Sequence, residues 1–205
     1  MLHCIETIKY NINNNLIMKI IFIDAHEKRN RISPDVGVVD TPEKSPYVPK
    51  GEIWFDKAYE KEYDFFMAMY KLEKKLMKQG MPFSEVKKIV RETFVKKSKK
   101  LPEYTIKTEN KGGFLVRYVK GEIVRQYIDP KFLLGGHSHV YSYIPANEIW
   151  LDDAQGEEEF RYTLAHELHE IELVRNGMDY NSAHDFALAA EKHERRKDGA
   201  VYLDD

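Results

Sequence analysis

The chain has 205 residues, of which 42% are hydrophobic and 12% aromatic, and this composition excludes a disordered protein and suffices for one core or two small ones. The formal net charge of −2 leaves no global basic field, and the basic run Lys96 to Lys100 is typical of a solvated helix end, so we expect no nucleic-acid partner. The single cysteine, Cys4, excludes an internal disulfide framework and a cysteine-rich zinc site, and it favours a reducing, cytoplasmic location.

The first part of the chain predicts an extension, a strand and a loop. Residues 1 to 17 are polar and rich in asparagine, and we expect them to form a disordered extension. The apolar run Leu16 to Ile23 predicts a buried strand, because it is far shorter than the roughly 20 residues that a membrane span needs. We therefore expect no membrane partner. The prolines within residues 31 to 49 predict a loop, either over the functional site or on the surface.

The later elements predict an α+β protein. Residues 114–120 and 122–128 flank Lys120 and Gly121 and predict a β-hairpin. Further strands are predicted at 139–144 and 148–152, and helices at 58–79, 83–99, 157–176 and 180–197. The predicted fold class is α+β, with small antiparallel strands and two helical hairpins.

The sequence contains an internal repeat. Residues 48–63, VPKGEIWFDKAYEKEY, align with residues 144–159, IPANEIWLDDAQGEEE, at an offset of 96. At an offset of 97, MKQGMPF (77–83) aligns with VRNGMDY (174–180). Two copies are too few for a solenoid, so we predict that they pack in one domain or as two joined lobes. The first copy is expected at residues 18–110, as a scaffold, and the second at 111–205.

The two copies differ in their chemically active side chains. Only Glu170 keeps a like residue, Glu73, whereas the other pairs at the offset of 97 are His166 with Met69, Glu167 with Tyr70, His184 with Lys87 and Glu191 with Phe94. This difference indicates that the second copy carries a site. The alternative is that both copies are structural.

The predicted helix at 157–176 has an apolar stripe with a carboxylate inside it. At 100° per residue the stripe is formed by Phe160, Leu164, Leu168, Ile171 and Val174. Glu167 falls within the stripe, where a carboxylate is costly unless it is paired, protonated or bound to a metal. His166 and Glu170 lie at the edge of the stripe, whereas His169 is expected on the exposed, polar side.

The next predicted helix supplies a second set of ligand side chains. His184 and Glu191 share one of its faces, and Gly177 ends the preceding helix, so the two helices form an antiparallel hairpin. The hairpin brings His184 and Glu191 toward His166 and Glu170. Two histidines with one or two carboxylates are a usual zinc or iron set, so we predict that these four residues bind Zn²⁺ or another divalent transition metal.

His166 and Glu167 resemble the start of the HExxH helix of the zincin metallopeptidases. Glu170 stands where that family has its second histidine, which gives HExxE and departs from the peptidase pattern. The resemblance covers residues 161–191. It implies that His166 is a ligand, that Glu167 is the general base, and that a further ligand comes from the next helix.

A wider resemblance is to a family of proteins from phages and prophages. It is carried by Gly135-Gly136-His137, by the YIPxxEIW stretch at residues 143–150, and by the HELHE and GMxYxxAHxxAxxxE stretches that follow. The resemblance implies that these positions belong together. It adds His137 as an extra ligand or as a partner of a ligand, the alternative being that GGHSH is only a turn entering a strand.

These observations leave three hypotheses for function. The first is a metal-dependent hydrolase, most simply a zinc metallopeptidase-like enzyme, which acts on a peptide or small amide with metal-activated water and Glu167 as general base. The second is a non-catalytic, phage-related structural or interaction protein, in which an ion or a His/Glu network pins the helix hairpin. The third, a two-metal carboxylate site, lacks the paired Glu-x-x-His motifs of four-helix examples. A closed four-ligand shell favours the second, and an open position favours the first.

Overall fold

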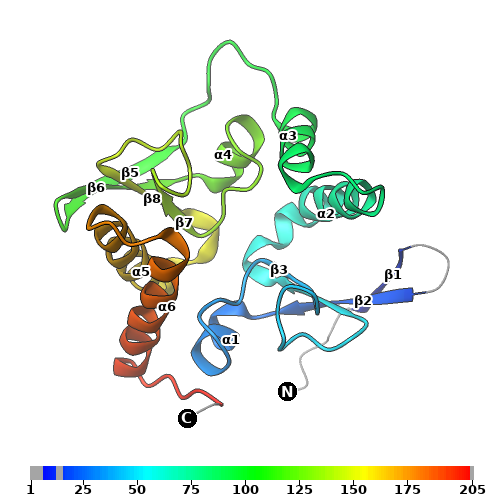
Figure 1. Cartoon of the computed structure of the whole chain (residues 1–205), viewed down its shortest axis with the longest axis horizontal. Coiled ribbons are helices and arrows are strands. Elements are labelled where there is room, and N and C mark those ends of the chain that lie inside the picture. The colour runs from blue at the N-terminus through cyan, green and yellow to red at the C-terminus, as the bar shows by residue number, and fades with distance from the viewer. Residues whose placement is uncertain (1–6, 13–15, 204–205) are drawn as a thin grey trace. The chain divides into compact units, whose positions relative to one another are not determined.

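The computed structural model describes residues 7–12 and 16–203 and confirms an α+β protein (Figure 1). The first half contains β1 (Thr7–Ile12), β2 (Leu16–Ile23), α1 (Ala25–Arg31), β3 (Val39–Asp40), β4 (Glu52–Asp56), the 3₁₀ helix η1 (Lys57–Glu62), α2 (Tyr63–Lys78) and α3 (Phe83–Phe94). The second half contains β5 (Thr105–Lys111), β6 (Phe114–Val119), α4 (Gly121–Tyr127), β7 (Gly135–His137), β8 (Glu148–Asp152), the 3₁₀ helix η2 (Asp153–Gln155), α5 (Glu157–Arg175) and α6 (Tyr180–Lys197). Both halves thus follow the same order of elements.

Each half forms a sheet of the same topology. The strand orders are β1-β2-β4-β3 and β5-β6-β8-β7, with antiparallel outer pairs and a parallel central pair. The parallel pairs were not anticipated, since only antiparallel strands were expected. They arise because a short helix, α1 or α4, and a loop separate the two central strands in each half, and a crossover of this kind returns the chain in the same direction.

The hydrogen bonds of the two halves correspond at the offsets found in the sequence. The amide of Asp56 donates to the carbonyl of Val38 (2.9 Å), and that of Asp152 donates to Leu134 (2.8 Å), an offset of 96. At the end of the first long helix the offset becomes 97. There the amide of Met81 bonds the carbonyl of Leu76 (3.2 Å), and the amide of Met178 bonds Leu173 (3.1 Å).

The compact units of the chain divide it differently from the repeat. One unit comprises the described residues up to Glu60 together with those from Leu188 onward, and the other comprises Lys61 to Ala187. The helix pair α2–α3 of the first half therefore belongs to the second unit, and the end of α6 belongs to the first. The boundary expected between 110 and 111 falls inside strand β5.

The first unit contains part of the predicted extension. Residues 7–12 form β1, and Leu16 and Ile17 open β2, so these positions of the expected disordered segment pair within a sheet. The remaining positions of that segment lie outside the described residues. The predicted strand at 16–23 has the bounds of β2, and the segment 31–49 is a loop that includes the short strand β3.

The second unit has a core on each face of its sheet. On one face α5 packs against β7 and β8, and its predicted apolar stripe contributes Leu164 and Ile171 to a cluster with Ile149 and Leu151. Ile149 and Leu151 are fully buried, and burial of such a side chain stabilises the fold by about 1.5–3 kcal/mol. The other face is covered by a cluster formed by Val119, Val124, Phe132, Ile144 and Trp150.

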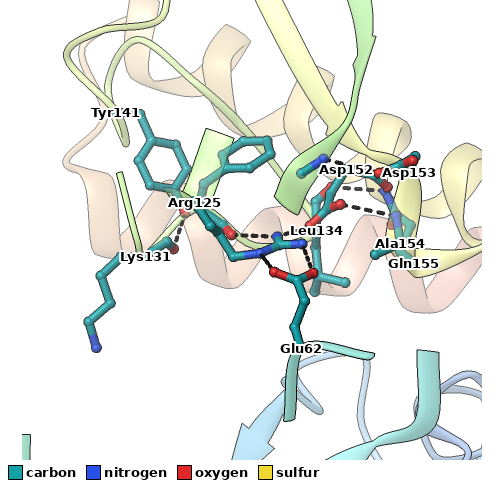
Figure 2. Close-up of polar contacts among 11 residues, drawn as sticks. Glu62, Arg125, Lys131, Leu134, Tyr141, Asp152, Asp153, Ala154 and Gln155 are labelled. Atoms are coloured by element: carbon teal, nitrogen blue, oxygen red, sulfur yellow. Dashed lines mark hydrogen bonds and ion pairs between the residues drawn. The ribbon is translucent and has the colours of Figure 1, made fainter. Parts of the chain in front are cut away.

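A fully buried arginine, Arg125 of α4, ties the second unit together (Figure 2). Its guanidinium donates to the carbonyl of Phe132 (3.0 Å), to the carboxylate of Asp152, and to that of Glu62 at the end of η1. The first unit holds the corresponding pair, in which Arg29 donates to Asp56 (3.3 Å). Buried arginines need such partners because an unpaired buried charge is strongly unfavourable.

Two strand predictions in the second half were wrong. Residues 122–128 were expected to form a hairpin with 114–120, but residues 122–127 lie in α4, which buries Gly121, Val124 and Arg125 at helical spacing. The partner of β6 is β5, and the turn between them uses Gly112 and Gly113, which have φ of 57° and 80°. The β-branched residues of the segment suggested a strand, whereas the bonds of Arg125 favour the helix.

The segment 139–144, also expected to be a strand, forms turns. The carbonyl of His137 accepts the amides of Val140 (3.0 Å) and Tyr141 (2.9 Å), and this chain reversal leaves no room for a ladder. The helix expected at 83–99 ends at Phe94. In the part of the chain that the structure describes, no helix is long and apolar enough to cross a membrane.

Candidate metal centre

Three elements of the second unit bring the candidate ligands together. His137 ends strand β7, His166, Glu167 and Glu170 lie on α5, and His184 lies near the start of α6. The i and i+4 spacing places His166 and Glu170 on neighbouring turns. The Gly177 turn, with φ of 93°, reverses the chain between the two helices.

A glycine allows the strand to approach the helix at the site. A Cβ atom at Gly135 would lie 2.7 Å from the side-chain methyl of Thr163 and 3.2 Å from Oε1 of Glu167. Both values are shorter than ordinary van der Waals contacts. The backbone of β7 therefore lies directly against α5 at the level of Glu167, and this position of the strand places His137 beside Glu170.

The first ligand group consists of His166, Glu170 and His184. Nε2 of His166 lies 3.2 Å from Nδ1 of His184 and 3.6 Å from Oε2 of Glu170, and the distance from His184 Nδ1 to Glu170 Oε2 is 2.8 Å. In a tetrahedral zinc site with 2.0–2.1 Å bonds, ligand atoms are about 3.3 Å apart. The three atoms thus form one face of a tetrahedron of suitable size for such an ion.

The first group is buried on one side and accessible on the other. The side chain of Glu170 is 2% exposed, whereas that of His184 is 33% exposed. The ring of Tyr180 stacks on the ring of His184, with centroids 6.0 Å apart and an interplanar angle of 19°. This stacking restricts the rotation of the imidazole, whose Nδ1 lies 2.8 Å from Oε2 of Glu170.

The second ligand group consists of His137, Glu167 and Glu170. Nε2 of His137 lies 2.8 Å from Oε1 of Glu170 and 3.8 Å from Oε2 of Glu167. Among the described residues, neither Nε2 of His137 nor Oε2 of Glu167 has a hydrogen-bond partner, although Nε2 of His137 lies within ion-pair distance of Glu170. Nδ1 of His137 accepts the amide of His139 at 3.2 Å. Glu170 therefore belongs to both groups, through different oxygens.

The two carboxyl groups of the centre have opposite pKa shifts. Burial raises the pKa of Glu167 to about 7, against the opposing effect of the neighbouring imidazoles. Burial also acts to raise the pKa of Glu170, but the contacts with His137, His166 and His184 outweigh it and lower that pKa below its usual range. Glu170 is therefore a carboxylate at neutral pH, whereas Glu167 exchanges a proton near neutrality.

The structure does not bring Glu191, the fourth predicted ligand, to either group. Seven residues along a helix correspond to about 10 Å, so Glu191 lies two turns from His184. Its Oε1 accepts bonds from Nε (2.9 Å) and Nη2 (2.8 Å) of Arg195, which is fully buried. Glu191 was predicted as a ligand because it shares a helix face with His184. Two residues on one face of a helix can still be far apart along the helix axis, so this criterion does not place them in one site.

The helical register argued from the sequence holds for most of α5. Glu167 is buried, as its place in the apolar stripe predicted. His169, expected to be exposed, is half-buried, and it belongs to neither ligand group. Tyr162, expected on the polar side, is 6% exposed. Sequence reasoning missed the roles of Gly135 and Tyr180. The i and i+4 spacing of Tyr180 and His184 was the available signal for the latter.

Comparison of the chain with protein-family models, with curated proteins and with solved structures found no match. The likeness to zincins and to phage proteins therefore remains an expectation from sequence. An inference about function depends on the geometry and chemistry of the two ligand groups.

Proposed function

We propose that the protein is a metal-dependent hydrolase that binds a divalent transition ion, most simply Zn²⁺, through His166, His184 and Glu170. The observation that carries this proposal is the triangle of three ligand atoms, with edges of 2.8 to 3.6 Å. Hydrolytic zinc sites have three protein ligands and a fourth position for water, while structural sites are closed by four. The exposed side of His184 suits the open type.

The bound ion would supply a water of pKa about 7 and polarise the carbonyl of a substrate. Glu167 supports the proposal because it is a buried carboxyl next to a ligand, with a pKa close to neutral and a free Oε2. In this role Glu167 accepts the proton of the attacking water and returns it to the leaving amine. The substrate class that fits this chemistry is a peptide or another amide.

His137 acts on the centre through Glu170. Its Nε2 lies 2.8 Å from Oε1 of that carboxylate, while Oε2 faces the two other histidines. Groups that hold a ligand in this way fix its orientation, and their loss typically weakens metal affinity 10–100-fold. The burial of His137, which is 0% exposed, suits such a fixed role.

A second candidate function is non-catalytic. Nδ1 of His184 lies within hydrogen-bond distance of both Glu170 and His166, so these side chains form a polar network that joins α5 to α6 without any ion. A phage-related structural or interaction protein would need no more than this network. The two functions differ in the role of Glu167, which such a network leaves without a task.

The Glu167→Gln variant tests the proposal. It keeps the size of the side chain and the first ligand group, but removes the base, so the tightly bound metal of the first group and the melting temperature should stay near those of the parent. Turnover on a peptide library should fall about 10²- to 10⁴-fold. A parent protein that binds no metal, or that binds metal but shows no turnover on peptides or small amides, would contradict the hydrolase and favour the structural network.

A further inference from the structure

We infer that the second ligand group, His137, Glu167 and Glu170, binds a second divalent cation beside the first, with Glu170 as the bridge between the two. This inference rests on the proposed function, because the first ion occupies the group formed by His166, His184 and Glu170. The second site is weaker than the first, and its occupation removes Glu167 from proton transfer.

The two oxygens of Glu170 face different sets of ligands. Oε2 lies 2.8 Å from Nδ1 of His184, and Oε1 lies 2.8 Å from Nε2 of His137. A carboxylate that divides its oxygens in this way is a usual bridge in two-metal sites, where the ions lie about 3.5–4 Å apart. Only the bridge is shared, so each ion has two further ligands of its own.

The second group contains two buried ligand atoms without a hydrogen-bond partner. They are Nε2 of His137, which is 0% exposed, and Oε2 of Glu167, a residue 7% exposed. Buried polar atoms are almost always hydrogen-bonded, and an exception points to an ion or an ordered water. The two atoms are 3.8 Å apart, which is too long for a hydrogen bond and suitable for two ligands of one cation.

Charge also favours a cation at this position. The group contains two carboxyl groups and one imidazole, and among the described residues the ion-pair contacts of Glu167 and Glu170 are with histidines, not with lysine or arginine. A single divalent ion in the first group leaves a bridging carboxylate and a buried base close together. A second cation compensates that charge, whereas a water molecule does not.

The second site is the weaker one because its cation shares Glu170 with the first ion and is repelled by that ion, about 3.5–4 Å away. Nδ1 of His137 accepts the amide of His139, so the neutral ring carries its proton on Nε2, the atom that would bind the ion. Binding must displace this proton. The first group has a comparable requirement, because Nδ1 of His184 can bond the carboxylate of Glu170 only as a donor and must lose its proton to bind an ion.

Occupation of the second site has a consequence for catalysis. A carboxylate whose Oε2 is bound to a cation is a poor base, so excess metal should inhibit the hydrolase that the first ion activates. Turnover should therefore rise with the first equivalent of metal and fall with the second. This pattern follows from Glu167 being the base in one state and a ligand in the other.

The repeat provides a substitution that should preserve the fold. Thr41 occupies in the first half the position of His137 in the second, since each carbonyl accepts the amides of the residues three and four positions further along. His137→Thr therefore places at the end of β7 a side chain that the corresponding strand already has. Glu167→Gln provides an independent variant of the same group, and His169→Ala is a matched control outside it.

The test is a Zn²⁺ titration of the metal-stripped protein, followed by native mass spectrometry and by calorimetry. The parent and His169→Ala should bind two equivalents, the second at least tenfold more weakly. His137→Thr and Glu167→Gln should each bind one. If the parent binds one equivalent tightly and no second, or if both variants still bind two, the inference is wrong. A parent that binds no ion contradicts the proposed function itself.

Discussion

Thr41 and His137 occupy equivalent positions in the two halves of the chain. Thr41 directly follows the edge strand β3, and His137 ends the edge strand β7. The carbonyl oxygen of Thr41 accepts hydrogen bonds from the amides of Lys44 and Ser45, and that of His137 accepts them from Val140 and Tyr141. Both side chains are fully buried. The same backbone thus presents a hydroxyl in one half and an imidazole in the other, so the fold itself does not require the histidine.

The first prediction uses this equivalence at His166. Met69 stands at the corresponding place in α2 and is 5% exposed, so a helix of this type accommodates methionine there. His166→Met should therefore fold with a melting temperature near that of the parent while losing tightly bound metal. Elemental analysis and thermal denaturation check the two parts. A variant that folds and retains its metal would remove His166 from the ligand set.

The second prediction concerns His169, which is half-buried and outside both ligand groups. His169→Ala should change metal content little and stability by no more than about 0.5 kcal/mol, the usual range for a site without a special role. Metal analysis and urea denaturation provide the measurement. Loss of metal equal to that of His166→Met would show that the helix presents a different face to the centre.

The third prediction concerns the contact of β7 with α5. A methyl group at position 135 would lie 2.7 Å from Cγ2 of Thr163, so Gly135→Ala should lower stability by about 1–3 kcal/mol and weaken metal binding. Adding Thr163→Ser removes the methyl group and keeps the hydroxyl that donates to Gln155 at 2.5 Å. The double variant should recover most of both losses, and absence of recovery would assign the effect to another cause.

The fourth prediction concerns the buried charges around Arg125. Asp152→Asn removes the carboxylate from a pair whose side chains are both 0% exposed, and loss of one partner of a buried pair costs about 3–5 kcal/mol. Glu194→Gln breaks an exposed pair with Lys197 and should cost less than about 1 kcal/mol. Urea denaturation compares the two variants. Similar losses in both would mean that Arg125 does not depend on Asp152.

Elements with a local signal could be predicted from the sequence. The strand β2 was predicted from its apolar run, and the helix α6 from its residue pattern. The spacing of residues on two neighbouring helices also predicted that His166, Glu170 and His184 lie close together. The helix α4 could not be predicted, because its form depends on the bonds of Arg125 with Glu62 and Asp152, which are far from it along the chain. The parallel pairing of β6 with β8 is likewise non-local.

The sequence predicted which side chains of α5 and α6 converge, with the exception of Glu191, but not how the cluster continues to β7. Glu191 was included because it shares a helix face with His184, but it lies two turns away and bonds Arg195. His137 was placed near the centre only by resemblance, since its contact with Glu170 depends on how closely β7 packs on α5. The spacing of residues in the sequence therefore does not predict how far apart two side chains lie along a helix axis, or how closely a strand packs on a helix.

The most direct test of the central claim is the metal content of the untagged protein, purified without added metal. The account predicts at least one tightly bound equivalent of a divalent transition ion in the parent, and none in the double variant His166→Met with His184→Lys, whose new residues match Met69 and Lys87 of the first half. Thermal denaturation must show that the double variant is folded. A parent without metal, or a folded double variant with as much metal as the parent, would contradict the assignment of the site.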